Sequence, residues 1–212
     1  MRSLLLRCVL PLLLGMLALP ASAGIILVAH LSTDQEPPGT VTLTQDNGVD
    51  PRPESFGEAQ FLLNDAHTLL TMMVTVFNID VTGTQTPNVT NDNLVAAHIH
   101  AFNGPIAPTA PVRWGFFGSP DNDNLAPELV LTPFSNGVGG TFVSAWNQPE
   151  GNNGTTLTAQ LPFILQGLSY INFHTVQNPR GEIRGQLLIP EPATLLLLGF
   201  GMALLAAQRR RR

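Results

Sequence analysis

Cysteine and lysine are nearly absent from this 212-residue sequence. The only cysteine, Cys8, lies in the first apolar run, and there is no lysine at all. A domain that follows this run can form no disulfide and offers no thiol to a metal or a substrate. Its stability must therefore come from a buried core.

Basic residues are also scarce once the two ends of the chain are set aside. Six of the ten lie at positions 2, 7 and 209–212. Between residues 24 and 189, four arginines stand against fourteen acidic residues, which gives a formal charge of −10. Nucleic acid is a polyanion that such a domain would repel, so the sequence argues against a nucleic-acid partner.

The N-terminus has the features of a secretory signal peptide. Arg2 and Arg7 precede an apolar run of about a dozen residues, which is too short to span a bilayer stably. Ala21 and Ala23 fit the small-residue rule for cleavage. We predict that residues 1–23 form a signal helix that signal peptidase removes, and that the remainder is exported across the inner membrane.

The C-terminus carries a second apolar segment. It begins after Pro190, Glu191 and Pro192, and it ends in a basic cluster of Arg209, Arg210, Arg211 and Arg212. At about 1.5 Å per residue, residues 193–207 cover about 22 Å of a hydrocarbon layer roughly 30 Å thick. Arginines after an apolar segment favour a cytoplasmic end. We predict a short transmembrane helix that anchors the protein before processing.

The tail as a whole, PEPATLLLLGFGMALLAAQRRRR, resembles the PEP-CTERM sorting signal of Gram-negative bacteria. The resemblance implies that an exosortase, a protease-like enzyme of the membrane, recognises and removes the tail. It also implies delivery to the cell surface or the extracellular matrix, with extracellular polysaccharide and biofilm as the setting.

Residues 24–189 have the length of a single domain, and their pattern predicts an all-β fold. Short apolar or alternating runs are separated by Gly, Pro, Asn, Asp and Thr. The predicted strands are 25–31, 41–44, 56–63, 68–78, 94–100, 112–117, 138–146, 155–160, 170–175 and 182–189, with one helical turn at 161–168. That number of strands favours a single antiparallel β-sandwich of the Greek-key, immunoglobulin-like or superoxide-dismutase-like kind, with a closed barrel as the alternative.

The stretch LVAAHIH, residues 94–100, places two of the five histidines close together. Side chains alternate along a strand, so His98 and His100 project from the same face. Two neutral imidazoles can reach one ion, but a site needs further ligands. His174 is the candidate third ligand for Zn or Cu. The alternative is that the histidines fill a hydrogen-bonded network without an ion.

Residues 169–189 are predicted to form a hairpin around the turn NPRG. The antiparallel register places His174 opposite Glu182 and Asn172 opposite Arg184 on one face. Glu182 is therefore predicted to serve as a ligand or to orient an imidazole. Phe173 and its neighbours on the other face would point into the core.

Three blocks, AHLSTDQEPPG, AAHIHAFNGP and YINFHTVQNPRGEIRGQL, resemble the CHRD domain, which is named for chordin and also occurs in secreted bacterial proteins. The resemblance implies an extracellular all-β module with a binding or structural role. The chain has neither a G-x-S-x-G nor an H-E-x-x-H motif. We therefore expect a non-catalytic protein.

Overall fold

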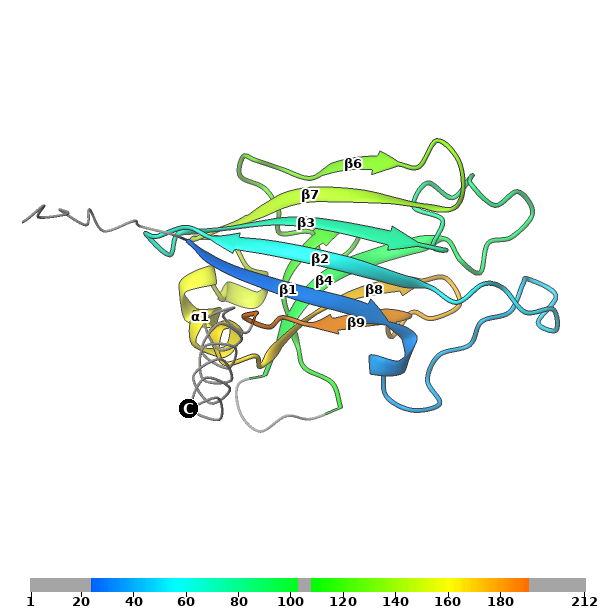
Figure 1. Ribbon diagram of the computed structural model, residues 1–212, viewed down its shortest axis with the longest axis horizontal. Coiled ribbons are helices and arrows are strands. Elements are labelled where there is room, and N and C mark those ends of the chain that lie inside the picture. Colours follow the sequence, from blue (N-terminus) through cyan, green and yellow to red (C-terminus); the bar gives the residue numbers. More distant parts are fainter. Residues whose placement is uncertain (1–23, 103–107, 191–212) are drawn as a thin grey trace, which may run out of the picture.

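The structure is a computed structural model that describes residues 24–102 and 108–190 (Figure 1). The predicted signal peptide, with Ala21 and Ala23, lies outside these residues, as does the predicted tail from Glu191 to Arg212. Within the described residues, no helix is long and apolar enough to cross a membrane.

The described chain is all-β, as predicted, with one α-helix and two short 3-10 helices. The strands are β1 (Ile25–Ser32), β2 (Phe56–Leu63), β3 (Leu69–Phe77), β4 (Leu94–Ala101), β5 (Val112–Phe117), β6 (Val130–Pro133), β7 (Gly139–Asn147), β8 (Ser169–Thr175) and β9 (Ile183–Gln186). The helices are α1 (Leu157–Leu165), η1 (Thr33–Gln35) and η2 (Asn152–Gly154).

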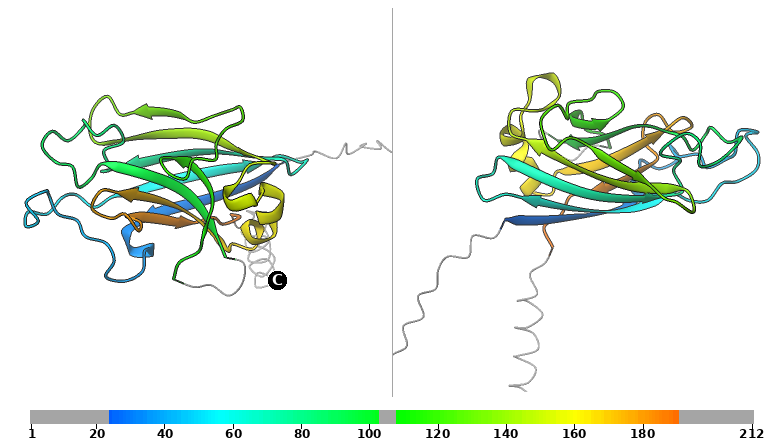
Figure 2. Two further views of the ribbon diagram at one scale, coloured as in Figure 1. Left: turned by 180° about the vertical axis from the view of Figure 1, so that it is seen from behind. Right: turned by 90° about the horizontal axis from the view of Figure 1, so that it is seen from above.

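All nine strands belong to one antiparallel sheet in the order β5-β4-β8-β9-β1-β2-β3-β7-β6. The sheet curls into a half-barrel (Figure 2). β1 and β9 share only the pair Ser32 and Arg184, with a further bridge between Val28 and Leu188. The sequence predicted a sandwich of two separate sheets, whereas the structure has one sheet. Its two halves, β5-β4-β8-β9 and β1-β2-β3-β7-β6, meet along a seam between β9 and β1 that has few hydrogen bonds.

The core lies between the two halves of the curled sheet. Trp114 on β5 stacks on Trp146 on β7, with ring centroids 5.6 Å apart. Phe142 on β7 also contacts Phe173 on β8, with the rings edge to face at 5.2 Å. These contacts join strands that are far apart in the sheet order. The curl of the sheet therefore brings strands from its two ends against one shared core.

Three segments differ from the sequence prediction. Residues 41–44 contribute only an isolated bridge between Thr44 and Pro51. The expected strand at 155–160 is instead the start of α1, because the Thr156 hydroxyl accepts a hydrogen bond from the Ala159 N–H and caps the helix. β6 was not predicted; it is an edge strand of four residues that lacks a buried face.

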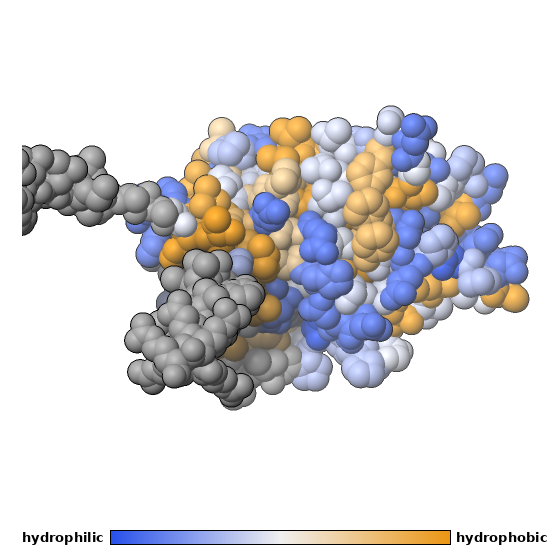
Figure 3. Space-filling model, viewed as in Figure 1, coloured by the Kyte–Doolittle hydropathy of each residue, from blue (hydrophilic) through white to orange (hydrophobic). Residues whose placement is uncertain are grey.

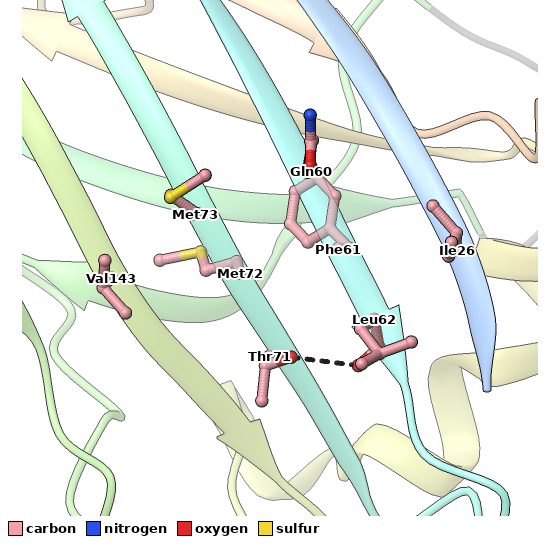
Figure 4. Close-up of a pocket in the computed structure, with 8 residues that line it drawn as sticks. All are labelled: Ile26, Gln60, Phe61, Leu62, Thr71, Met72, Met73 and Val143. Atoms are coloured by element: carbon pink, nitrogen blue, oxygen red, sulfur yellow. Dashed lines mark hydrogen bonds between the residues drawn. The ribbon is translucent and has the colours of Figure 1, made fainter. Parts of the chain in front are cut away.

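A shallow apolar groove lies on the outer face of β1, β2, β3 and β7 (Figure 4). Ile26, Leu62, Met73 and Val143 line it and are each about half exposed. Further apolar side chains appear on this side of the molecule in the space-filling view (Figure 3). The groove contains no histidine and lies away from β4 and β8.

Candidate functional site

The structure brings the three predicted histidines together. His98 and His100 lie on β4, and His174 lies on the adjacent strand β8. In the ladder between these strands, Ala96 pairs with His174 and His98 pairs with Asn172, so His174 is the diagonal neighbour of His98. One ring nitrogen from each histidine lies within 4.8 Å of the other two.

All three imidazoles are buried although they face away from the core. Their residues are 4%, 7% and 7% exposed, in chain order. The core side of the same strands carries Ala97, Ile99 and Phe173. Loops that bring in Ala110, Ser119 and Pro179 contact the histidine face. The site is therefore enclosed between the sheet and these loops.

Each imidazole uses one nitrogen to contact a backbone carbonyl. His98 Nε2 lies 3.1 Å from Ser119 O, His100 Nδ1 lies 2.8 Å from Ala110 O, and His174 Nδ1 lies 3.2 Å from Pro179 O. The opposite nitrogens turn inward. His98 Nδ1 lies 3.2 Å from His174 Nε2, and His100 Nε2 is buried without a hydrogen-bond partner among residues 24–102 and 108–190.

Local structure fixes the carbonyl next to His98. The loop after β5 folds back over the strand, where the Asn122 N–H donates to Gly115 O at 2.8 Å. A Cβ at position 115 would lie 1.8 Å from Pro120 O and 3.0 Å from His98 Cδ2. Only glycine allows this approach, so Gly115 lets the loop place Ser119 against the imidazole.

The ring of Tyr170 supports His100. The two rings stack with centroids 4.8 Å apart and an interplanar angle of 5°. The Tyr170 hydroxyl accepts a hydrogen bond from the Ala110 N–H at 3.0 Å, and the Arg184 guanidinium lies 4.8 Å from the ring centroid. Tyr170 thus connects the sheet, the covering loop and His100.

Burial keeps the imidazoles neutral near pH 7. It lowers the pKa of His98, that of His100 to about 4 and that of His174 to about 3, because a buried cation loses its hydration. The hydrogen bonds to the carbonyls act in the opposite direction but do not offset burial. Neutral imidazole is the form that binds a metal ion.

In metal-free protein, lowering the pH from 7 to 4 is expected to reduce the free energy of unfolding, because these buried histidines resist protonation more than unfolded histidine does. Unfolded histidine takes up a proton near pH 6.5, whereas His100 and His174 resist protonation until their pKa values of about 4 and 3. The stability they contribute is complete above pH 6.5 and falls with pH, by about 3 kcal/mol for each histidine at pH 4. Urea unfolding across this range measures the loss.

Glu36 provides the opposing change that this experiment must separate. Its burial raises its pKa to about 7, so its contribution to stability is complete below pH 4.5 and is lost as the pH rises through 7. The variant His100→Asn with His174→Gln isolates the histidine part. Equal pH dependence in the variant and the wild type would contradict the assignment.

Glu182 takes a different place from the one predicted. Its carboxylate accepts hydrogen bonds from four side chains, Arg52, Ser55, Thr175 and Asn178. Gly181 precedes it with φ of 128°, and a Cβ there would lie 2.4 Å from Glu36 Oε1 and 2.7 Å from the Asn172 amide atoms. The absence of a side chain at Gly181 therefore leaves room for the side chains of Glu36 and Asn172. Glu182 itself pairs with Arg52 and not with a histidine. The groups that orient the imidazoles are backbone carbonyls instead.

The register predicted for the hairpin is otherwise confirmed. Asn172 pairs with Arg184, and Tyr170 pairs with Gln186. Glu36 was not predicted to belong to this region, although it lies in the block AHLSTDQEPPG that carries part of the CHRD resemblance. Its Oε1 and the Oδ1 of Asn172 are both buried and lack a hydrogen-bond partner within the described residues.

The curled sheet and its buried histidine face define an all-β domain with a polar site under loops. The chain belongs to the CHRD domain family, whose model matches residues 27–187. The PEP-CTERM protein-sorting motif matches residues 188–212, which marks the chain as an exported protein that an exosortase processes. No curated protein and no solved structure matches the chain.

Proposed function

We propose that this protein is a non-catalytic component of the cell surface or the extracellular polysaccharide matrix. The observation that carries the proposal is the position of the sorting motif, which begins at residue 188, directly after the last strand of the domain. Such a position suits a folded cargo that a removable tail delivers. The cargo would then act by binding or by its structure.

The end of the domain supports this arrangement. Val28 and Leu188 form two backbone hydrogen bonds with each other, each of 2.9 Å. These bonds hold the first residue of the sorting motif against β1. Pro190 is exposed, and within the described residues no hydrogen bond involves a residue after Leu188. Removal of the chain after Leu188 would therefore leave the hydrogen bonds among the described residues intact.

Deletion of residues 190–212 is expected to release the protein into the medium and to weaken the matrix. The truncated chain keeps its export signal but loses the segment that an exosortase and the membrane would hold. Fractionation of cultures with detection of the domain measures its location, and a biofilm assay measures the matrix.

A matched variant separates anchoring from recognition. The matched variant combines three substitutions, Pro190→Ala, Glu191→Ala and Pro192→Ala. It keeps the apolar segment and the four C-terminal arginines, so the protein should stay in the membrane fraction with its tail still attached. The same location and phenotype as the wild type in both variants would refute the proposal.

The histidine cluster favours metal binding as a second function. The surface role does not require it, since a structural cargo needs no ion. Its support is the inward direction of three neutral nitrogens in a buried site.

A further inference from the structure

We propose that His98, His100 and His174 form a site for one divalent transition metal ion of the zinc and copper class. The ligand atoms are His98 Nδ1, His100 Nε2 and His174 Nε2. The proposal rests on the metal-binding function proposed above and specifies its ligand atoms and its class of ion, and it is independent of surface delivery. It stands on the hydrogen bonds around the three rings.

The first step concerns where the ring protons are. A neutral imidazole has one N–H and one bare nitrogen, and a backbone carbonyl can only accept a hydrogen bond. The contacts to Ser119 O, Ala110 O and Pro179 O therefore place each proton on the outward nitrogen. The three inward nitrogens are then all bare lone pairs. This is the arrangement that second hydrogen bonds impose on metal-binding histidines.

The second step concerns the contact between His98 and His174. With both protons turned outward, the 3.2 Å between His98 Nδ1 and His174 Nε2 separates two acceptors, which repel each other. A shared cation removes this repulsion. Two Zn–N bonds of 2.0–2.1 Å at a tetrahedral angle separate their nitrogens by about 3.3 Å. The observed separation thus matches that of two ligands on one ion.

The third step adds His100. Its Nε2 is buried and has no hydrogen-bond partner in the part of the chain that the structure describes. A buried nitrogen without a partner is costly unless a ligand or an ion contacts it. His100 Nε2 lies within 4.8 Å of the other two ligand nitrogens. Ligand nitrogens on one ion are about 3.3 Å apart, so metal binding would draw the three nitrogens together by up to about 1.5 Å. Stacking on Tyr170 and the hydrogen bond to Ala110 O fix the direction of that nitrogen.

The surroundings also suit a cation. Asn172 lies opposite His98 in the ladder, and its Oδ1 is buried without a partner, as is Oε1 of the neighbouring Glu36. A purely structural network of histidines would be expected to satisfy its own polar atoms. Two unpartnered atoms, on Asn172 and Glu36, lie close together beside Gly181, and Asn172 projects from the same face of β8 as His174.

The chemistry of the donor set narrows the ion. Neutral imidazole nitrogen suits Zn²⁺ and Cu²⁺, whereas Ca²⁺ and Mg²⁺ prefer oxygen. Three histidines leave at least one further coordination position on either ion.

The test is metal binding by the full chain after treatment with a chelator. Isothermal titration with Zn²⁺ and Cu²⁺, and metal analysis after gel filtration, should find one ion per chain. His100→Asn and His174→Gln should each weaken binding by about 100-fold or more, since two ligands bind far less tightly than three. The matched control is His30→Gln, which removes an exposed histidine on β1 and should leave binding unchanged.

A spectroscopic measurement on the wild type keeps the test decisive if a variant misfolds. The electron paramagnetic resonance spectrum of bound Cu²⁺ should show hyperfine coupling to three nitrogens. Coupling to fewer than three nitrogens would overturn the proposal, as would equal binding in the wild type and a folded His174→Gln variant. An absence of stoichiometric Zn²⁺ and Cu²⁺ binding would overturn it as well, and the surface role would still stand.

Discussion

Glu182→Gln is expected to lower the free energy of unfolding by about 3–5 kcal/mol, because it leaves a buried arginine without its counter-ion. The side chains of Arg52 and Glu182 are 4% and 0% exposed. Arg52 Nη1 donates to Glu182 Oε1 at 2.8 Å, and Nη2 donates to Oε2. Every other partner of the carboxylate is also a donor. A glutamine offers one acceptor oxygen and turns an NH₂ group toward these donors.

The matched control is Glu58→Gln. Glu58 also lies in a carboxylate–base pair, with His30, but its side chain is 68% exposed. Exposed pairs of this kind contribute about 0–1 kcal/mol, so the control should unfold almost as the wild type does. Urea unfolding of both variants at pH 7 makes the comparison. If Glu182→Gln cost no more than the control, the ion pair would not hold the segment between η1 and β2, which carries Arg52, to the sheet.

Phe173→Ala is expected to cost about 3–5 kcal/mol through the cavity it leaves in the core. Phe173 is fully buried, and its ring lies 5.9 Å from that of Phe116 and 5.2 Å from that of Phe142. It therefore joins the half of the sheet that carries the histidines to β7 in the other half. Denaturant unfolding measures the loss.

Phe56→Ala removes the same ring from a different setting. Phe56 is 42% exposed and stacks on Phe77 with centroids 4.7 Å apart. Its truncation should cost about 1 kcal/mol, because a large part of its surface is already hydrated and the ring lies outside the core. Similar losses in the two variants would mean that the halves of the sheet are not held together by the aromatic contacts.

Short-range patterns were enough to predict the strands and which side chains share a face. The alternation in residues 56–63 gives the observed bounds of β2, and the two-residue spacing of His98 and His100 gives their common face. The turn NPRG fixes a local register, so the pairing of Asn172 with Arg184 followed from the sequence. In each case the interacting residues are close in sequence, and strand geometry decides the result.

Long-range partners could not be predicted in the same way. Arg52 and Glu182 are 130 positions apart, and no property of either residue identifies the other. The carbonyls of Ala110, Ser119 and Pro179 orient the imidazoles, but a backbone oxygen carries no sequence signal. The join between β1 and β9 has few hydrogen bonds, so one curled sheet and two separate sheets have almost the same strand pattern.

The place of β9 has a consequence for export. It is the last strand to leave the translocation channel, yet it lies between β8 and β1 near the middle of the sheet. The two halves can form earlier, but the seam between them closes only when residues 183–186 have emerged. The sorting motif, from residue 188, follows this strand directly in the chain. We therefore expect the fold to be completed only as the tail itself emerges, so that an exosortase would meet a cargo that has just finished folding.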